Sequence, residues 1–408
     1  MKKMLKSCFF LPVVRVLICI KIMKNAAMIS NAVYKRWQKM DKKFENYNID
    51  NVLFITSLVF ILAGLIMIYS SSAVMAIENY KDSAYFFKRQ LLWLFIGVIL
   101  GLLFFKLNKE KLKKIIFPLI VLGILMLFAV HIPGFGRKAN GAIRWLKIGP
   151  LPAFQPYEIV KLLYVIYLAY LFSKSNQTVN SKIIMATIIT LLIIVALIKQ
   201  RDLGGAVIIS ILFLCMAFVL GVNLFYFFIL FIFGIASTIY FILIEPYRLK
   251  RLLIILNPWQ DYYGSGWQII QSLIAIGSGG LFGNGLFQSQ QKFYYLPEVH
   301  TDYIFSIIGE ELGTFGCILI LIGFYFILQR GVFISISVKD AFLKYLAAGL
   351  TFMIIVQAII NIFVVTGILP PKGTTLPFIS FGGSALITNI IAVGILLSIS
   401  RDLHGDKL

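Results

Sequence analysis

The sequence predicts an all-α integral membrane protein with about ten transmembrane helices. Hydrophobic residues make up 60% of the 408-residue chain and charged residues only 13%, whereas a soluble globular protein carries about 25% charged residues. The apolar residues also occur in long runs rather than in periodic stripes. A helix of about 20 such residues crosses about 30 Å of hydrocarbon, so the length of this chain reports membrane spans rather than soluble domains.

The predicted spans follow one another along most of the chain. They are residues 52–74, 90–105, 115–131, 157–173, 182–199, 203–221, 223–244, 302–328, 341–366 and 379–399. An even number of spans places both termini on one side, and the lysine-rich segment 106–114 favours the cytoplasm for that side. The opposite loops, 136–147 and 247–251, are basic too, and an anionic external substrate would explain their charge.

Three further segments complete the predicted organisation. Residues 1–50 are expected to be a basic cytoplasmic extension, because Arg15 interrupts their short apolar stretch and no small-residue cleavage site follows. Residues 51–401 form the ten-span domain, and 402–408 form a cytoplasmic tail. The largest loop, about 245–301, lies between spans seven and eight on the extracytoplasmic side. It is predicted to hold a short interfacial helix near 266–276 and then a tight glycine turn.

The formal net charge of +21 and the four cysteines exclude few functions by themselves. In a membrane protein, cationic tails and loops meet anionic lipid headgroups, so we expect membrane lipids and no nucleic acid as partners. The cysteines show no metal-ligand spacing. The sequence also lacks a zinc motif, and it therefore indicates no metal site. It shows no P-loop, nucleotide fingerprint or Ser/His/Asp arrangement either.

Four of the 17 acidic residues are concentrated between positions 294 and 313: Glu298, Asp302, Glu310 and Glu311. Asp302 begins the predicted eighth span. A partly desolvated carboxylate there is a plausible general base, but aspartate is also favoured as a helix N-cap. From position alone the two roles stay equally open.

Glu310 and Glu311 are expected about 12–14 Å deeper than Asp302 on a continuous helix, and on diverging faces. They therefore cannot both share a site with Asp302. Buried carboxylates in a span usually pair with a cation or a polar backbone. A structural role is favoured for both, with a proton or ion relay as the alternative.

Other polar residues interrupt the apolar runs. Glu158 and Lys161 are three residues apart on one helical face and predict an ion pair, either structural or facing the substrate. Gln357 and Asn361, one turn apart, predict interhelical hydrogen bonds. The Pro/Gly-rich segment 367–389, with Lys372 at its centre, predicts a broken, cavity-lining start to the tenth helix.

Taken together, these residues predict an outward-facing cavity. Its expected cations are Arg144, Lys147, Arg201, Arg248 and Lys372, and Asp302 is its carboxylate, with His300 beside it. Cations of this kind stabilise phosphate charge. The residues alone thus indicate a protein that handles an anionic, lipid-linked substrate at the outer leaflet, as an enzyme or as a transporter.

Several long blocks resemble the SEDS family, which includes FtsW, RodA and SpoVE. The similar blocks are GLIMIYSSSAVMA (64–76), GAIRWLKIGPLPAFQPYEIVKL (141–162), NPWQDYYGSGWQIIQSLIAIGSGGLFGNG (257–285), KFYYLPEVHTDYIFSIIGEELG (292–313) and GILPPKGTTLPFISFGGSALITNIIAVGILLSISR (367–401). They occur in the family's order, and the resemblance covers about 52–401. There are departures: Arg201 and Gly205 replace the family's usual Pro and Thr, and Tyr157 replaces Ser.

The resemblance implies a peptidoglycan glycosyltransferase that polymerises lipid II into glycan strands at the outer face of the bacterial cytoplasmic membrane. Asp302 matches the family's essential aspartate, which acts as general base. Arg144, Glu158 and Lys161 match functionally important polar residues of the family. The expected substrate-binding set is Arg144, Glu158, Lys161, Arg201, Arg248, His300 and Lys372, with Glu310, Glu311, Gln357 and Asn361 as structural polar residues.

The resemblance also implies partners and alternatives. Expected partners are lipid II, the nascent glycan strand, a class B penicillin-binding protein acting as transpeptidase, and other division or sporulation proteins. The segment 80–90 favours FtsW or SpoVE over RodA, and hence a place at the division septum. A diphosphate substrate can bring Mg²⁺ or Mn²⁺ with it. The alternatives are a lipid II flippase and a non-catalytic scaffold for the transpeptidase.

Overall fold

Ten helices in the described part of the chain are long and apolar enough to cross a membrane, which confirms the predicted multi-span, all-α class. The computed structural model describes residues 49–139, 142–147, 153–244, 246–264, 266–293, 296–297 and 299–405. Nearly all of the predicted extension 1–50 therefore lies outside the described residues. The spanning helices are α2 (Asn51–Tyr80), α3 (Tyr85–Lys106), α4 (Lys109–Ala129), α5 (Pro156–Ser173), α6 (Val179–Lys199), α7 (Leu203–Leu220), α8 (Leu224–Ile244), α11 (Ile304–Ser337), α12 (Ala341–Val365) and α13 (Gly383–Gly405).

The helix starts follow ordinary capping chemistry. The carboxylate of Asp50 accepts a hydrogen bond from the Leu53 N–H at 2.9 Å, and Asp340 does the same for the Leu343 N–H at 2.9 Å. Pro156 occupies the first turn of α5, where its missing N–H costs nothing. Such caps satisfy N–H groups that have no partner within the helix.

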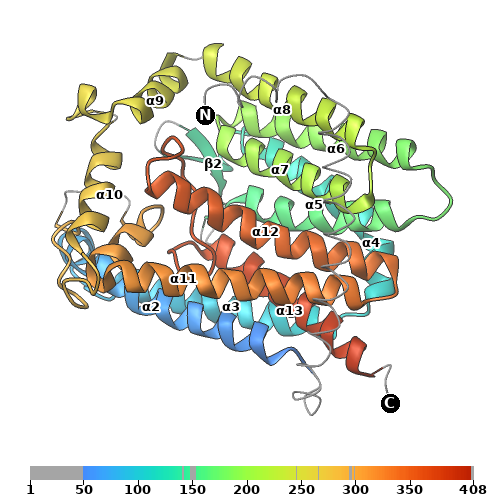
Figure 1. Ribbon diagram of the computed structural model, residues 1–408, viewed down its shortest axis with the longest axis horizontal. Helices are drawn as coiled ribbons and strands as arrows, with labels where there is room; N and C mark the ends of the chain where they lie inside the picture. Colours follow the sequence, from blue (N-terminus) through green and yellow to red (C-terminus); the bar gives the residue numbers. More distant parts are fainter. Residues whose placement is uncertain are drawn as a thin grey trace, which may run out of the picture. The chain divides into compact units, whose positions relative to one another are not determined.

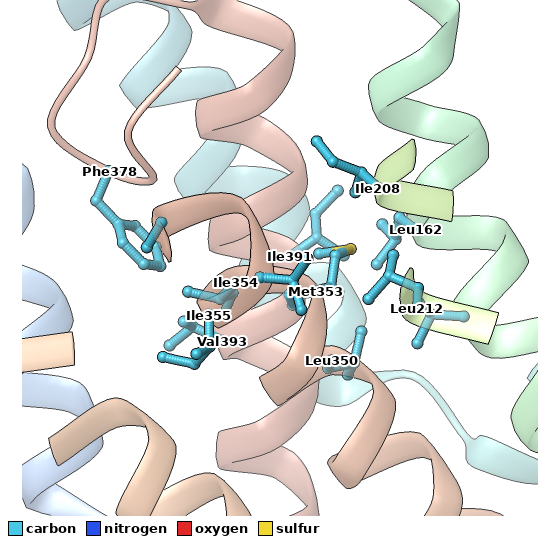
Figure 2. Close-up of a cluster of buried hydrophobic side chains, with 14 of the residues drawn as sticks. Leu162, Ile208, Leu212, Leu350, Met353, Ile354, Ile355, Phe378, Ile391 and Val393 are labelled. Carbon is cyan, nitrogen blue, oxygen red and sulfur yellow. The ribbon is translucent and has the colours of Figure 1, made fainter. Parts of the chain in front are cut away.

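The core lies among α5, α7, α12 and α13. In the apolar windows of α5, α12 and α13, 78%, 67% and 83% of residues are buried, whereas the window of α8 has no buried residue. Figure 2 shows Leu162 of α5, Leu212 of α7, Met353 of α12 and Ile391 of α13 in this core. Helix α8 contacts α7 and α9 and otherwise presents its apolar side chains outward.

Small elements near α10 were only partly predicted. Helix α10 (Trp267–Ser278) confirms the helix expected near 266–276, and Figure 1 shows it at one end of the spanning helices. Its Ser272 hydroxyl lies 2.7 Å from the Ser306 hydroxyl and donates to the Val365 carbonyl at 2.6 Å, so α10 packs against α11 and α12. The sequence did not predict α9 (Pro246–Leu256) or the short 3₁₀ helix η2 (Pro258–Asp261).

A short antiparallel hairpin was also not predicted. Strand β1 (Gly136–Ala139) pairs with β2 (Ala142–Leu146), with Gly136 opposite Leu146. The Leu146 N–H then donates to the Phe154 carbonyl at 2.9 Å, which ties the hairpin to the residues that precede α5. The loop that carries Arg144 therefore contains a regular strand rather than irregular chain.

Helix α11 is broken at Gly313, where φ is 67° and ψ is −167°. A Cβ built on Gly309 would lie 3.4 Å from the Cys317 sulfur, although eight residues along a straight helix cover about 12 Å. The chain therefore turns a sharp corner between a short helix that starts at Ile304 and the long part that ends at Ser337. The continuous helix expected over 302–328 is therefore wrong, because it is interrupted at Gly313.

The connection between α12 and α13, residues 366–382, enters the helix bundle without forming a helix. A Cβ on Gly64, in the interior of α2, would lie 2.7 Å from the Phe378 carbonyl oxygen, so only glycine permits this approach. The buried Gln90 of α3 donates to the Ser380 carbonyl at 3.3 Å. The predicted broken start of the tenth helix is thus present, but α13 begins at Gly383 rather than at 379 and continues to Gly405.

Candidate functional site

Asp302 lies two residues before α11, at the mouth of the re-entrant connection 366–382. The N-cap of α11 is Tyr303, whose side chain makes no capping hydrogen bond, so Asp302 does not occupy the N-cap position that the sequence left open for it. The Asp302 side chain is half-buried. A Cβ built on Gly373 would lie 3.6 Å from Asp302 Oδ2. The carboxylate therefore faces the glycine that directly follows Lys372.

Asn361 of α12 contacts both the backbone of Asp302 and the connection 366–382. Its Nδ2 donates to the Asp302 carbonyl at 2.8 Å and to the Thr374 carbonyl at 2.5 Å. The side chain is fully buried, where an unpaired carbonyl costs about 1–3 kcal/mol. Asn361 thus fixes the backbone of Asp302 relative to the segment that carries Lys372.

Lys372 lies over the first turn of α7. A Cβ on Gly204 would lie 3.3 Å from Lys372 Cδ and 3.5 Å from Asp202 Oδ1, so the Lys372 stem and the Asp202 carboxylate are neighbours. Burial lowers the pKa of Lys372 below its ordinary value, and the negative charge of Asp202 partly opposes that shift. Asp202 is itself fixed, because it caps α7 by accepting from the Gly205 N–H at 3.0 Å.

Arg144 approaches Asp202 from the hairpin. Its Nη1 lies 4.0 Å from Asp202 Oδ1, and its guanidinium also donates to the carbonyls of Gln200 and Arg201. Arg201 has a left-handed backbone, with φ of 58°, and an exposed residue surface. Asp202 therefore stands between Arg144 and Lys372, and it holds two cations near each other.

The predicted pair of Glu158 and Lys161 lies within the bundle. Lys161 Nζ is 2.6 Å from Glu158 Oε2 and also donates to Gln357 Oε1. The Gln357 amide in turn donates to the carbonyl and the hydroxyl of Thr375, each at 3.0 Å. Since Lys161 has no exposed surface, a substrate cannot reach its ammonium in this arrangement. The ammonium instead supports the re-entrant connection through Gln357.

Glu310 and Glu311 lie at the corner of α11, away from Asp302. Glu310 accepts from the Ser289 hydroxyl at 2.5 Å and from the Gln290 N–H at 2.7 Å. Glu311 accepts from the Ser70 hydroxyl of α2 at 2.6 Å and lies 3.6 Å from Lys292 Nζ. Both carboxylates are buried and attach the loop after α10 to the corner.

The remaining predicted site residues are His300 and Arg248. The His300 ring is buried, with centroids 4.4 Å from Phe86 and 5.6 Å from Phe381, so it packs within an aromatic cluster. Arg248 belongs to α9, but its side chain lies outside the described residues, as does Glu298.

Some residues of this arrangement were missed as site residues. Asp202 could have been found, because Asp-Leu-Gly-Gly before an apolar run is a helix-cap signal. Gln90 had a signal too, since an isolated polar residue within a span usually marks a polar contact. Ser289 and Lys292 carried none, because their contacts with Glu310 and Glu311 depend on the corner at Gly313.

The site can perform acid–base and anion-binding chemistry. Asp302 supplies one partly exposed carboxylate, and Lys372 and Arg144 supply positive charge next to Asp202. In the part of the chain that the structure describes, no group of three or more His, Cys, Asp or Glu side chains is placed to hold a metal ion. One base and several cations are suited to transfer from a phosphorylated donor.

Comparison with known proteins places this arrangement in context. Residues 50–405 match the sequence model of a family, FtsW/RodA/SpoVE, described as cell cycle protein. The chain is 38% identical to the probable peptidoglycan glycosyltransferase FtsW of Trichlorobacter lovleyi, over 89% of this chain and 96% of that protein. It is 42% identical to stage V sporulation protein E of Bacillus subtilis, over 86% of this chain and 97% of that protein.

Solved structures show the same fold. One, described as the structural coordination of polymerization and crosslinking by a peptidoglycan synthase complex, has a TM-score of 0.72 and 28% identity, covering 87% of this chain and 98% of that one. The rod shape determining protein RodA of Thermus thermophilus has a TM-score of 0.64 and 25% identity, covering 87% and 97% of the two chains.

Proposed function

This chain belongs to the FtsW, RodA and SpoVE family of cell cycle proteins, and from that premise we infer that it is a peptidoglycan glycosyltransferase that polymerises lipid II into glycan strands. The observation that carries the catalytic part of this proposal is the placement of the Asp302 carboxylate against Gly373, next to Lys372. The base is thereby held against the backbone segment that carries the cation.

Asp302 is proposed as the general base. The 4-hydroxyl of the acceptor sugar gives its proton to the Asp302 carboxylate as its oxygen attacks the anomeric carbon of the donor. The bond between that carbon and the phosphate oxygen breaks, and undecaprenyl diphosphate leaves with the electron pair. Asn361, which holds the Asp302 carbonyl at 2.8 Å, keeps the base in position for this transfer.

Lys372 and Arg144 are proposed to stabilise the leaving diphosphate. Cations aimed at the charge that develops in a transition state lower the barrier, because they need no reorganisation at the moment of reaction. Asp202, which lies 4.0 Å from Arg144 and next to Lys372, holds these cations without neutralising both. Arg201, with an exposed surface, is proposed to contact the same diphosphate from the membrane surface.

A divalent cation is proposed to arrive with the substrate. Mg²⁺ and Mn²⁺ take oxygen ligands, and they often bind through one or two carboxylates plus substrate phosphates. Asp302 and Asp202 are the carboxylates that this site offers, and each already has a role, as the proposed base and as the cap of α7. The diphosphate would therefore supply most of the oxygen ligands of the divalent cation.

The cellular setting is proposed from the relatives. Both termini are placed in the cytoplasm, so that Asp302 lies at the outer face of the membrane. A class B penicillin-binding protein is proposed as the transpeptidase partner, since a structural neighbour is described as a peptidoglycan synthase complex. Similarity to FtsW and to stage V sporulation protein E supports a role at the division or sporulation septum.

Purified protein in detergent, supplied with labelled lipid II, tests the function directly. The wild-type chain should produce glycan strands on a gel, and Asp302→Asn should abolish them while the thermal unfolding temperature is retained. Asp82→Asn is the matched control, because Asp82 lies in the loop after α2 and pairs with the exposed Lys88. Normal polymerisation by Asp302→Asn would exclude Asp302 as the base.

The flippase alternative is separated by a second assay. Liposomes that contain the protein and fluorescent lipid II report headgroup translocation and polymer in the same sample. Polymer without translocation supports the polymerase. Translocation without polymer, unaffected by Asp302→Asn, would favour the flippase, and neither activity would favour a non-catalytic scaffold.

A further inference from the structure

A second polar site lies at the other end of the helix bundle from Asp302. A cavity of about 360 Å³ opens there between the end of α3, the start of α4, the start of α12 and the end of α13. Asp340, which caps α12, lines this cavity, whereas Asn361 of the same helix contacts Asp302. The two sites are therefore about 30 Å apart along α12.

The cavity is rich in cations. Lys106, Lys109, Lys113 and Arg401 line it, together with the two carboxylates of Glu110 and Asp340. Lys113 is shared between those two carboxylates, at 2.7 and 3.6 Å, and Lys109 pairs with Asp402. Among the described residues Lys106 makes no ion pair, and it is exposed at the rim. A positive charge is thus left for an external anion.

Arg401 is positioned to act with Lys106. Its guanidinium lies 4.8 Å from the centre of the Phe105 ring, which directs it towards the end of α3. Among the described residues it forms an ion pair with the Asp402 carboxylate at 3.7 Å, a distance at which an exposed pair contributes little. The guanidinium therefore keeps N–H groups that can donate hydrogen bonds to a phosphate oxygen.

The surroundings identify the source of the anion. Next to the cavity, α3 presents Leu102 and Leu103, and α4 presents Ile115 and Phe117, with 44–59% of each residue exposed. In a spanning helix such side chains face the acyl chains of the bilayer. A phosphate held by Lys106 and Arg401 would thus have hydrocarbon directly beside it, as the headgroup of a lipid does.

We propose that this cavity binds the phosphate headgroup of an anionic phospholipid. Basic pockets between transmembrane helices are suited to such headgroups, because the cations lie at the level of the lipid phosphates. The site is separate from the polymerase site and does not depend on the proposed reaction. Its function would be to attach this end of the bundle, where α3 and α13 end and α4 and α12 begin, to anionic lipid.

Thermal unfolding of the purified full chain in neutral detergent tests the proposal. Added dioleoylphosphatidylglycerol should raise the unfolding temperature by about 2–4 °C, the size expected for modest ligand binding, and zwitterionic dioleoylphosphatidylcholine should not. The variant Lys106→Gln/Arg401→Gln should lose most of that rise. Lys111→Gln/Lys114→Gln is the matched control, since it removes two exposed charges of α4 that do not line the cavity.

Further measurements distinguish a lipid headgroup from a free phosphate as the bound anion. Inorganic phosphate and glycerol 3-phosphate at the same concentration should give little or no rise, and native mass spectrometry should detect fewer bound phosphatidylglycerol molecules on the cavity variant than on the control variant. An equal rise with inorganic phosphate would identify a free-anion site and overturn the lipid proposal. An unchanged rise in the cavity variant, or none in the wild type, would also overturn it.

Discussion

The side-chain amide of Asn361 lies 2.8 Å from the Asp302 carbonyl oxygen, and the same nitrogen lies 2.5 Å from the Thr374 carbonyl oxygen. Asp302 precedes α11 and Thr374 follows α12, so one buried side chain joins two segments that are distant in sequence. The proposed base and the proposed cation Lys372 depend on this junction for their relative position.

Asn361→Leu should therefore lower the kcat for glycan polymerisation by about 10- to 100-fold, because small displacements of a catalytic group have effects of that size. The KM for lipid II should change much less, since Asn361 is buried away from the substrate. Initial rates over a range of lipid II concentrations measure both quantities.

The matched control for Asn361→Leu is Asn176→Leu, in the exposed loop between α5 and α6. This variant should leave kcat, KM and the unfolding temperature unchanged. A rise in KM without a loss of kcat in Asn361→Leu would show that Asn361 contacts substrate and does not position Asp302.

The buried pair of Glu158 and Lys161 gives a prediction about stability. Lys161→Met should destabilise the protein by about 3–5 kcal/mol, because it leaves the Glu158 carboxylate buried without its cation. The double variant Glu158→Gln/Lys161→Met should be more stable than Lys161→Met alone. Unfolding in denaturant, measured for all four combinations, gives the coupling energy between the two side chains.

Activity in the same set of variants tells whether the pair also contacts substrate. If the pair acts only through the stability of the helix bundle, the double variant should recover activity along with stability. Recovered stability with no polymerisation would contradict a purely supporting role for Lys161.

The spans could be predicted because their signal is local. A run of apolar residues long enough for the bilayer specifies a helix wherever it occurs, and α5, α6 and α7 begin and end within a few residues of the predicted bounds. The resemblance further selected Asp302 among four neighbouring acids. Both results depend on residues that are close together in the chain.

The corner at Gly313 could not be predicted, because its cause is tertiary. The Asn284 N–H donates to the Glu310 carbonyl at 2.9 Å, and the Thr314 N–H donates to the Gly280 carbonyl at 2.9 Å. The loop after α10 therefore replaces the helical partners that the break removes. For the same reason the position of Asp202 between Arg144 and Lys372 needs three segments to meet, and no local pattern encodes that meeting.

Lys372 gives a prediction about pH. Burial lowers its pKa below the ordinary 10.5, so the ammonium loses its proton, and its stabilisation of the leaving group, at a lower pH than an exposed lysine would. The alkaline decline of kcat/KM should move to higher pH in Lys372→Arg, because a guanidinium stays charged there. Lys111→Arg, at an exposed position, should leave the profile unchanged.

The lowered pKa of Lys372 should also make the stability of the protein depend on pH, in the opposite direction to its activity. Between its lowered pKa and about 10.5 the unfolded chain holds the Lys372 proton and the folded chain does not, so the free energy of unfolding should rise with pH across that window. Lys372→Arg should lack this part of the rise. An identical pH dependence of stability in the wild type and in Lys372→Arg would contradict the burial of a titrating ammonium at this position.

Gly313 provides the strictest test of the corner in α11. Its φ of 67° and ψ of −167° lie in a region that is open essentially to glycine alone, and an added Cβ would lie 2.4 Å from the Gly283 nitrogen. Gly313→Ala should therefore lower the unfolding temperature strongly and reduce polymerisation. Gly277→Ala is the matched control, because a Cβ there meets nothing within 4 Å and alanine favours the helix. Equal stability of the two variants would mean that α11 does not turn a corner at Gly313.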